Sequence, residues 1–387
     1  MPRPALILIE TPPLALYLHI PWCVRKCPYC DFNSHPVRET LDERAYVDAL
    51  LRDLAYEAGA VPGREVESVF IGGGTPSLFS GEAIDALLRG VRNQVVLASD
   101  VEITLEANPG TAEAGRFAAY REAGVNRLSL GVQSLDAAKL KALGRIHGPD
   151  EARAAVAMAR AAGFDNLNLD LMFGLPDQRV EQALADLERA IDLGPEHLSW
   201  YQLTLEPHTA FAAAPPSLPD EDRLWQMQQA GSDRLRRAGY VQYEVSAHAR
   251  AGHRCRHNLN YWRFGDYLGI GAGAHGKVSG PGGVERRWKR RRPDSYLKEV
   301  VGGGGLAGRR ILSEHDRQAE FMLNALRLTK GFSPSLFEHR TGLSLKRIGP
   351  VLEEAVQKGL IESSWRDRVV PSVKGRLFLD DLVSLFL

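Results

Sequence analysis

The chain has 387 residues, 44% of them hydrophobic, and its 48 basic and 48 acidic side chains give a formal net charge of zero. This length fits one large α/β domain with a small one, or two mid-sized domains, and the neutral balance provides no global attraction to nucleic acid or an acidic membrane surface. No apolar run reaches the ~20 residues of a membrane-spanning helix. Residues 1–10 lack the order of a signal peptide, so we expect a cytoplasmic protein whose thiols stay reduced.

Short apolar runs alternate with longer amphipathic stretches in the first half of the chain. The predicted strands are 15–19, 68–71, 101–106, 127–131, 167–173 and 198–204, and the predicted helices are 42–57, 83–95, 112–123, 151–162 and 180–193. This alternation is typical of parallel strands joined by right-handed crossovers. Six such units suit an open doubly wound sheet or a partial barrel. We favour a partial (β/α)6 barrel, because the polar and glycine-rich residues that follow the strands would then share one rim.

The regular alternation ends near Pro207. The following segments predict an extended connector at 212–219, a helix at 221–238 and a glycine linker at 302–305. The last part predicts three helices, two short runs at 360–363 and 368–371, and a final helix, an order that fits a winged-helix-like helical domain. The predicted domains are a core barrel at 1–210, a barrel extension at 211–305 and a C-terminal domain at 306–387.

Three cysteines, Cys23, Cys27 and Cys30, lie in one short loop directly after the first predicted strand. Three thiolates at this spacing can bind three corners of a cuboidal [4Fe-4S] cluster and leave one iron open. Sparse cysteine usage argues against a disulfide framework. Zinc remains an alternative, but structural zinc normally has four ligands, and Cys255 lies far along the chain. The triplet therefore favours an iron–sulfur cluster that binds a reactant.

Polar and glycine-rich residues follow the other predicted strands. Glycine lets backbone amides approach a ligand closely, although a tight turn is the alternative for the Gly-Gly-Gly-Thr-Pro segment that ends at Pro76. Buried polar side chains serve either a ligand or an internal network. Carboxylates accept ribose hydroxyls and arginine pairs with a carboxylate, so the set suits a zwitterionic, ribose-bearing ligand. Its members are Glu106, Gln133, Arg145 and Asp170.

These motifs carry a resemblance. The cysteine spacing, Tyr29 before the last cysteine, and the Gly-Gly-Thr-Pro turn are similar to those of the radical S-adenosylmethionine (SAM) superfamily. The segment from Tyr17 to Cys23 narrows the resemblance to the branch of oxygen-independent coproporphyrinogen III dehydrogenases and the related HemW heme chaperones. It covers nearly the whole chain. The resemblance implies that Cys23, Cys27 and Cys30 bind the cluster and that SAM fills the open iron site.

The resemblance also implies roles for single residues. Positions that match contacts to the first SAM are Tyr17, Gly73, Thr75, Glu106 and Arg145. Positions that match contacts to a second SAM in the dehydrogenase are Gly72, Gln133 and Asp170. Two departures count against porphyrinogen oxidation. Phe32 stands where the dehydrogenase has a further cysteine, and this sequence shows no counterpart of the dehydrogenase's long N-terminal extension. Both departures are features of the HemW branch.

The segment from His257 to Trp262 resembles the His-Asn-x-x-Tyr-Trp signature of the HemW branch. Imidazole is a good axial ligand for heme iron, and Tyr261 and Trp262 offer flat apolar surface for a macrocycle. The alternative is an aromatic plug under the barrel rim, in which His257 only forms hydrogen bonds. With the resemblance, we expect His257 to bind heme. Cys255 is a further candidate for a thiolate ligand of the heme, but no other feature of the sequence supports that role.

Six of the seven residues from Arg286 to Arg292 are cations. Such runs are usually solvated or pair with polyanions, so a plain surface patch is the first interpretation, with heme propionates, an acidic partner or nucleic acid as the others. The winged-helix-like end also suggests nucleic acid. The neutral chain and the lack of a clear basic recognition helix argue against that partner.

The resemblance as a whole implies a heme chaperone that binds a [4Fe-4S] cluster, SAM and heme. Its expected partners are heme acceptors such as respiratory cytochromes at the membrane. Reductive cleavage of SAM to a 5′-deoxyadenosyl radical is chemistry available to this fold. Two alternatives remain open: a coproporphyrinogen III dehydrogenase, and a radical SAM protein that modifies or binds nucleic acid.

Overall fold

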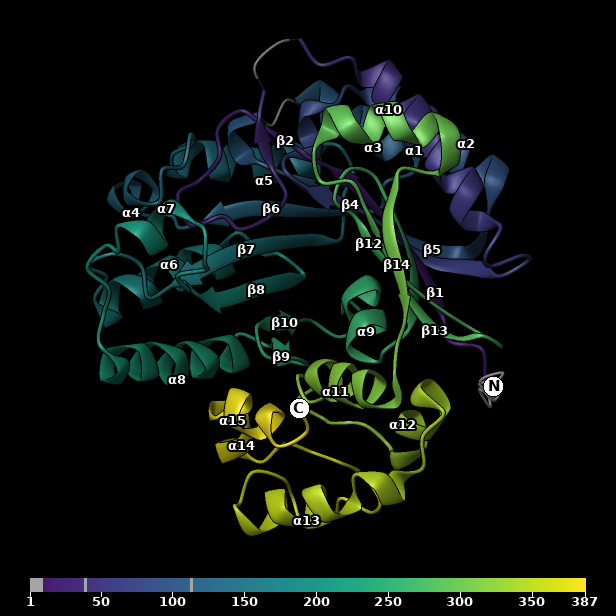
Figure 1. The fold of residues 1–387 in the computed structure, drawn as a ribbon. Coiled ribbons are helices and arrows are strands. Elements are labelled where there is room, and N and C mark those ends of the chain that lie inside the picture. Colours follow the sequence, from purple (N-terminus) through teal and green to yellow (C-terminus); the bar gives the residue numbers. More distant parts are fainter. Residues whose placement is uncertain (1–9, 38–39, 112–113) are drawn as a thin grey trace.

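The computed structural model describes residues 10–37, 40–111 and 114–387, and Figure 1 shows their arrangement. Within these residues, one sheet of 12 strands has the order β14-β13-β12-β11-β1-β4-β5-β6-β7-β8-β10-β9. Its six central strands are parallel. They are β1 (Leu14–Ile20), β4 (Glu65–Gly73), β5 (Val96–Ala107), β6 (Arg127–Gln133), β7 (Leu167–Phe173) and β8 (His197–Gln202). These correspond to the six predicted strands and confirm the partial (β/α)6 barrel.

Helices alternate with these strands. The main ones are α1 (Glu43–Ala58), α2 (Gly81–Gln94), α3 (Ala114–Ala123), α5 (Pro149–Ala161), α6 (Val180–Asp192) and α8 (Glu221–Arg237). The helix predicted at 112–123 is confirmed from residue 114, and its first two residues lie outside the described part. Asp42, Ser80 and Asp220 start α1, α2 and α8 by accepting a backbone N–H three residues ahead. Six of the seven residues of β1 are buried, which explains its continuous apolar sequence.

The sheet continues past β1 through four strands that the sequence analysis did not predict. β11 (Asp266–Ile270) lies parallel to β1, and β12 (His275–Gly280), β13 (Gly283–Lys289) and β14 (Leu306–Ile311) continue antiparallel. The glycines at 302–305, expected to form a linker, instead end α10 (Pro293–Gly303) and turn into β14. Gly304 has a φ of 72°, a left-handed conformation that suits a glycine after a helix.

The opposite edge of the sheet is short. β10 (Ala247–Ala249) lies antiparallel to β8, and β9 (Val241–Gln242) pairs with β10. Between β8 and α8, residues 214–220 form the expected connector after the short helix α7 (Ala210–Ala213). This edge therefore ends in strands too short to offer much unpaired backbone.

The basic run around β13 is largely neutralised inside the protein. Lys289 is 1% exposed, and its Nζ lies 2.5 Å from a carboxylate oxygen of Asp53 and 2.5 Å from one of Glu57, both on α1. Arg286 pairs with Glu320 at 2.6 Å. The interpretation of the whole run as a plain surface patch is therefore wrong, because these charges bind the sheet extension to α1 and to the C-terminal module.

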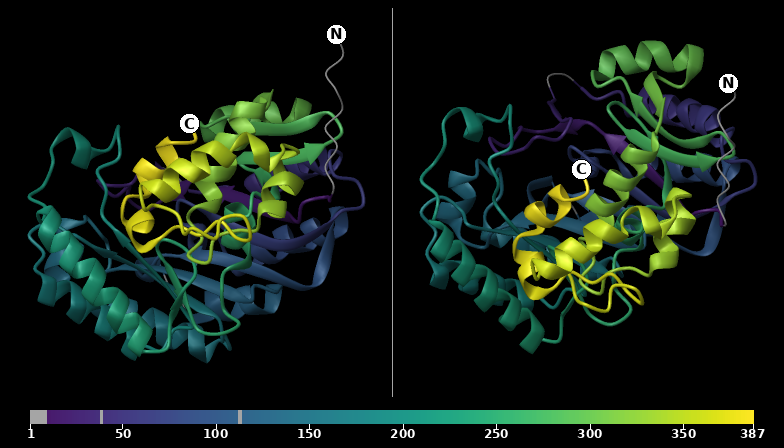
Figure 2. Two further views of the ribbon diagram at one scale, coloured as in Figure 1. Left: turned by 90° about the horizontal axis from the view of Figure 1, so that it is seen from below. Right: turned by 60° about the horizontal axis from the view of Figure 1, so that its bottom comes forward.

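The C-terminal module packs beside the sheet extension, as Figures 1 and 2 show. Its helices are α11 (Glu314–Ala325), α12 (Pro334–Thr341), α13 (Gly349–Gln357), α14 (Val373–Leu377) and α15 (Leu379–Ser384). The two predicted short runs meet in an antiparallel bridge between Ile361 and Pro371, so the winged-helix-like order is confirmed. In the described residues, no helix combines the length and apolar character needed to cross a membrane.

Candidate cofactor site

The cysteine loop is anchored at the carboxyl end of β1. Its two ends pair as the short strands β2 (Trp22–Cys23) and β3 (His35–Pro36). Within the loop, the Asn33 side-chain amide donates to the carbonyls of Ala272 at 2.9 Å and Arg291 at 2.8 Å. These bonds tie the loop to the sheet extension, so the extension positions the cysteines as well as the barrel does.

Two side chains of β1 connect the loop to the barrel interior. His19 Nε2 lies 2.8 Å from the carbonyl oxygen of Asn33, and His19 Nδ1 lies 3.0 Å from the hydroxyl of Tyr17. Burial lowers the pKa of His19, which favours a neutral ring. Tyr17 lies in the middle of β1 and is linked to the cysteine loop through His19.

The three cysteine thiols share one electrostatic environment. Burial is the main cause that raises the pKa of Cys23 and of Cys30, and the neighbouring thiols add to the rise. Arg145 Nη1 donates to Cys27 Sγ at 3.5 Å. In the described chain, no three histidine, cysteine or acidic side chains converge on a single metal-ion position. Thiols that bind separate irons of a cuboidal cluster need not do so, and a bound metal would deprotonate them.

The glycine turn after β4 packs directly against the cysteine loop. The N–H groups of Gly74 and Thr75 donate to the carbonyls of Ile20 and Trp22, both at 2.7 Å. A side chain on Gly74 would meet the Trp22 carbonyl oxygen at 2.5 Å. Gly73 has a φ of +119°, and its N–H donates to Glu106 at 3.0 Å. The glycines thus permit close contact between two loops, which supports the tight-turn interpretation and leaves Thr75 facing the cysteines.

Two buried carboxylates lie at the next strands. Glu106 on β5 and Asp170 on β7 each have a raised pKa, mainly through burial. Asp170 accepts hydrogen bonds from Ser129 at 3.0 Å and from Asn168 at 2.8 Å. The pKa of Glu106 rises to about 8, with the charge of Asp170 as the second cause. Such a pair favours a ligand that brings positive charge or hydroxyl donors.

Gln133 and Arg145 form a second part of the rim. Gln133 accepts a hydrogen bond from the Tyr201 hydroxyl at 2.9 Å, and its φ of 67° places it in the left-handed region. Arg145 donates to the carbonyl of Gly131 at 2.7 Å as well as to Cys27. The backbone bend at Gln133 therefore keeps its amide and the guanidinium of Arg145 on the same side as the cysteines.

Glu106 provides a pH-dependent prediction. Its carboxyl has a pKa of about 8 in the native protein against an ordinary value of 4.5, so the native state keeps a proton that the unfolded state has released between these values. The free energy of unfolding should therefore fall as pH rises through this interval, by up to about 1.4 kcal/mol per pH unit from this group. The Glu106→Gln variant should lose that part of the decline. Chemical denaturation of cluster-free protein at several pH values measures it, and identical pH profiles for both proteins would contradict the prediction.

The helix α9 (Arg256–Trp262) carries the predicted heme motif and faces the barrel interior. The ring of His257 lies 5.0 Å from that of Phe70 and 6.2 Å from that of Tyr17, and its Nδ1 lies 3.3 Å from the Ser68 hydroxyl. His257 is 3% exposed, and among the described residues its Nε2 finds no hydrogen-bond partner. Burial lowers its pKa to about 3. Both interpretations of the motif fit this arrangement. The His257 ring packs among aromatic side chains as part of a plug, and it is also a neutral imidazole whose Nε2 is left without a hydrogen bond within the described residues.

Cys255 has a structural role at the start of α9. Its thiol donates to Glu102 at 3.6 Å, and the same carboxylate accepts the N–H of Arg256 at 2.9 Å. Burial raises the pKa of Cys255 to about 12. A thiol that stays protonated is a poor metal ligand. Cys255 instead helps to attach the start of α9 to β5 through its hydrogen bond with Glu102.

Several polar residues that hold this site were not predicted from the sequence. His19 follows Tyr17 by two positions on the same strand, and that spacing places both side chains on one face. Tyr201 and Asn33 gave no comparable signal, because their partners are distant in sequence. Arg127 begins β6 and is 2% exposed. A cation at the first position of a strand normally suggests a solvent-exposed end, so its burial beneath the carboxylates could not be predicted.

The family model described as the radical SAM superfamily matches residues 17–190, and the model described as the HemN C-terminal domain matches residues 312–378. The solved structure of coproporphyrinogen III oxidase (HemN) from Escherichia coli, titled a radical SAM enzyme, has a TM-score of 0.82 at 25% identity and covers 97% of this chain and 90% of its own. Fold and motifs therefore define a radical SAM protein with a HemN-type C-terminal domain.

Several curated relatives match over their full length. The heme chaperone HemW of Escherichia coli is 51% identical over 98% of this chain and 100% of the relative. The heme chaperone HemW of Haemophilus influenzae is 48% identical over 98% and 99%, and that of Mycobacterium tuberculosis 36% identical over 99% and 97%. The chain belongs to the HemW family.

Proposed function

We propose that the protein is a heme chaperone that binds a [4Fe-4S] cluster, SAM and heme, and delivers heme to acceptor proteins. The observation that carries the proposal is the full-length similarity to relatives named heme chaperones, at up to 51% identity in the matches described above. The site geometry supports it, because cysteines, carboxylates and arginine gather on one rim. The acceptors are respiratory hemoproteins at the membrane, reached from the cytoplasm.

The cluster would be bound by Cys23, Cys27 and Cys30, with Arg145 balancing the charge of the thiolates. When bound, it supplies an open iron for SAM and an electron for reductive chemistry. The resident residues would bind and orient SAM: the buried carboxylate of Glu106 favours the positive or hydroxyl groups of the ligand, and Thr75 lies beside the first cysteine. Tyr17 and Gly73 complete this set.

The second set would be Gly72, Gln133 and Asp170, matched to a second SAM. Gly72 and Gln133 lie at the carboxyl ends of β4 and β6, and Asp170 lies within β7. Gly72 packs against Glu106 closely enough that a Cβ would meet its carboxylate oxygen at 3.0 Å. The two sets are thus contiguous through Glu106. Binding stoichiometry of SAM to the cluster-loaded protein distinguishes one molecule from two.

Heme binding would involve the α9 motif. The imidazole of His257 is neutral and its Nε2 is unused, which are the properties of an axial ligand. Because His257 is only 3% exposed, heme can reach this nitrogen only after α9 moves away from β1 and β4. Slow heme association is therefore expected, since such local opening precedes binding.

The rival function is oxidation of coproporphyrinogen III, which is favoured by the structural similarity to HemN. Phe32 is 59% exposed and cannot act as the further cysteine of the dehydrogenase. The decisive experiment uses anaerobically reconstituted protein. Heme titration followed by transfer to an apo-acceptor should succeed, whereas incubation with coproporphyrinogen III, SAM and a reductant should give no vinyl-bearing product. Product in stoichiometric excess over protein, or absence of heme binding, would overturn the chaperone proposal.

The His257→Ala variant tests the heme ligand. We expect heme affinity to fall by about tenfold or more, as loss of a direct metal ligand implies, while the visible spectrum of the iron–sulfur cluster stays unchanged. The matched control is His315→Ala, since His315 is exposed on α11. An unchanged Soret band and affinity in His257→Ala would remove this histidine from the heme site.

A further inference from the structure

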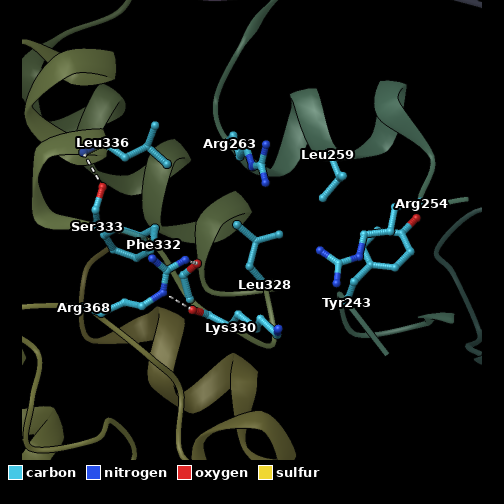
Figure 3. Close-up of a pocket in the computed structure, with 11 residues that line it drawn as sticks. Tyr243, Arg254, Leu259, Arg263, Leu328, Lys330, Phe332, Ser333, Leu336 and Arg368 are labelled. Atoms are coloured by element: carbon cyan, nitrogen blue, oxygen red, sulfur yellow. Dashed lines mark hydrogen bonds between the residues drawn. The ribbon is translucent and has the colours of Figure 1, made fainter. Parts of the chain in front are cut away.

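A pocket of about 310 Å³ lies where α9 meets the C-terminal module (Figure 3). One wall comes from α9 and the segments before it, and the other from the loops around α12. The lining includes Arg254, Leu259, Arg263, Leu328, Lys330 and Arg368. The two walls are joined by the N–H of Thr329, which donates to the carbonyl of Tyr243 at 3.1 Å, and by an ion pair between Arg327 and Glu244 at 3.0 Å. The pocket is therefore a fixed feature of the junction.

The pocket gathers four cations and no carboxylate. Arg254 and Arg263 approach from the barrel side, and Lys330 and Arg368 lie on the opposite wall (Figure 3). Within the described ranges, none of the four forms an ion pair with an acidic side chain, whereas most cations of the β13 run do. Like charges held together without a counter-ion repel one another. This cluster is therefore the part of the junction that an anionic ligand would stabilise.

Arg368 has a fixed orientation in this pocket. Arg368 donates through Nε to the carbonyl of Lys330 at 2.5 Å and through one Nη to the carbonyl of Gly331 at 3.1 Å. These bonds fix the guanidinium plane, and within the described residues its other Nη donates to no protein acceptor. Partial burial, followed by the charges of Arg254 and Arg368, lowers the pKa of Arg263. An arginine with a fixed plane is suited to a carboxylate, which it can bind through two parallel hydrogen bonds.

The remaining lining is apolar. Leu259 lies on α9, and Leu328 and Leu336 line the pocket from the C-terminal module (Figure 3). A ligand that matches this lining has an apolar body and more than one carboxylate. Because Leu259 and Arg263 are separated by four residues, they lie on one face of α9. His257 and Tyr261 share the inner face, where their rings are 5.2 Å apart. The helix α9, which carries the proposed heme ligand on its inner face, thus presents one apolar and one cationic side chain, Leu259 and Arg263, to this pocket.

We propose that this pocket binds the propionate carboxylates of the heme cargo, an inference that rests on the proposed function. Arg263 and Arg368 bind the carboxylates from opposite walls, Arg254 and Lys330 add charge, and Leu259 and Leu336, both partly exposed in the lining, contact the edge of the macrocycle. The C-terminal module therefore takes part directly in cargo binding, and the propionates hold the heme at the junction beside α9.

The experiment compares heme with its dimethyl ester, in which the propionate charges are absent. Cluster-loaded wild-type protein should bind heme about 10- to 100-fold more tightly than the ester, the range expected for loss of charge-assisted hydrogen bonds. The double variant Arg263→Gln, Arg368→Gln should bind both forms with nearly equal, ester-like affinity. Both side chains are exposed, so the fold should tolerate the change. The single variant Lys330→Gln should reduce the difference only in part.

The control variant Arg44→Gln alters an exposed arginine on α1 and should keep the full preference for heme. Wild-type protein that binds heme while the double variant retains wild-type affinity and ester discrimination would overturn the pocket and leave the chaperone function intact. Wild-type protein that binds neither form would overturn the proposed function and the pocket with it. A thermal unfolding midpoint equal to that of the wild type confirms that the double variant is folded.

Discussion

The Cys27→Ser variant is expected to contain almost no iron and sulfide after anaerobic reconstitution, whereas the wild type should contain about four of each per chain. The reason is the geometry of the loop. Cys27 is the middle ligand of the triplet, and its sulfur is the acceptor for Arg145 at 3.5 Å. Two remaining thiols cannot hold a cuboidal cluster that already has one open iron. Iron and sulfide analysis and the visible absorbance of the cluster measure the loss.

The control for this prediction is Cys255→Ser. Cys255 is buried against Glu102 at the base of α9 and is separate from the cysteine loop, so this variant should assemble a normal cluster. A Cys27→Ser protein with full iron content would show that the ligand set is wrong. Zinc at one ion per chain in protein purified without oxygen would favour the zinc alternative instead.

The parallel core could be predicted because its strands are simple. Six of the seven residues of β7 are buried, and its observed bounds equal the predicted ones. The sheet extension could not be predicted, because its strands contain charges that are satisfied from far away. Lys289 on β13 is 1% exposed and pairs with Asp53, and Lys277 on β12 pairs with Asp266 at 2.8 Å. In a sequence such lysines indicate solvent, and only the fold brings their carboxylates into reach.

The site shows the same division. The rim residues Glu106, Gln133 and Asp170 were predicted because each follows or lies within a buried strand of a parallel sheet, and such strand ends meet on one edge. The residues that hold the rim and the cysteine loop were not predicted. Tyr201 bonds to Gln133 across 68 positions of the sequence, and Asn33, in the cysteine loop, bonds to Ala272 across 239. Contacts of this kind depend on strand order and register, which hydrophobic periodicity does not reveal.

The position of α9 links the two proposed ligands. Tyr17 lies between them, since its hydroxyl contacts His19 near the cysteine loop and its ring lies 6.2 Å from that of His257. A movement of α9 that frees His257 for heme would also expose one side of Tyr17. SAM and heme binding are therefore expected to affect each other through this tyrosine, and by linkage any such effect on affinity must be reciprocal.

The second large effect is expected for Gly74→Ala, although this change adds only one methyl group. The new Cβ would lie 2.5 Å from the carbonyl oxygen of Trp22 and 2.9 Å from the carbonyl carbon of Pro21. Both contacts are with backbone, so no side-chain rotation can relieve them, and the cysteine loop must shift. The shift removes or weakens the two 2.7 Å bonds from Gly74 and Thr75, worth about 1 kcal/mol each. It also moves Cys23, the residue after Trp22.

We therefore expect Gly74→Ala to bind iron incompletely and to lose its cluster in air several-fold faster than the wild type. The matched control is Gly115→Ala on α3, where a Cβ would have no atom of the described part of the chain within 4 Å. That variant should keep the normal cluster and gain up to about 1 kcal/mol in stability, because alanine favours a helix over glycine. A wild-type cluster lifetime in Gly74→Ala would mean that the contact between the glycine turn and the cysteine loop does not position the ligands. A shortened lifetime confined to Gly74→Ala would identify that contact as the support of the first cysteine.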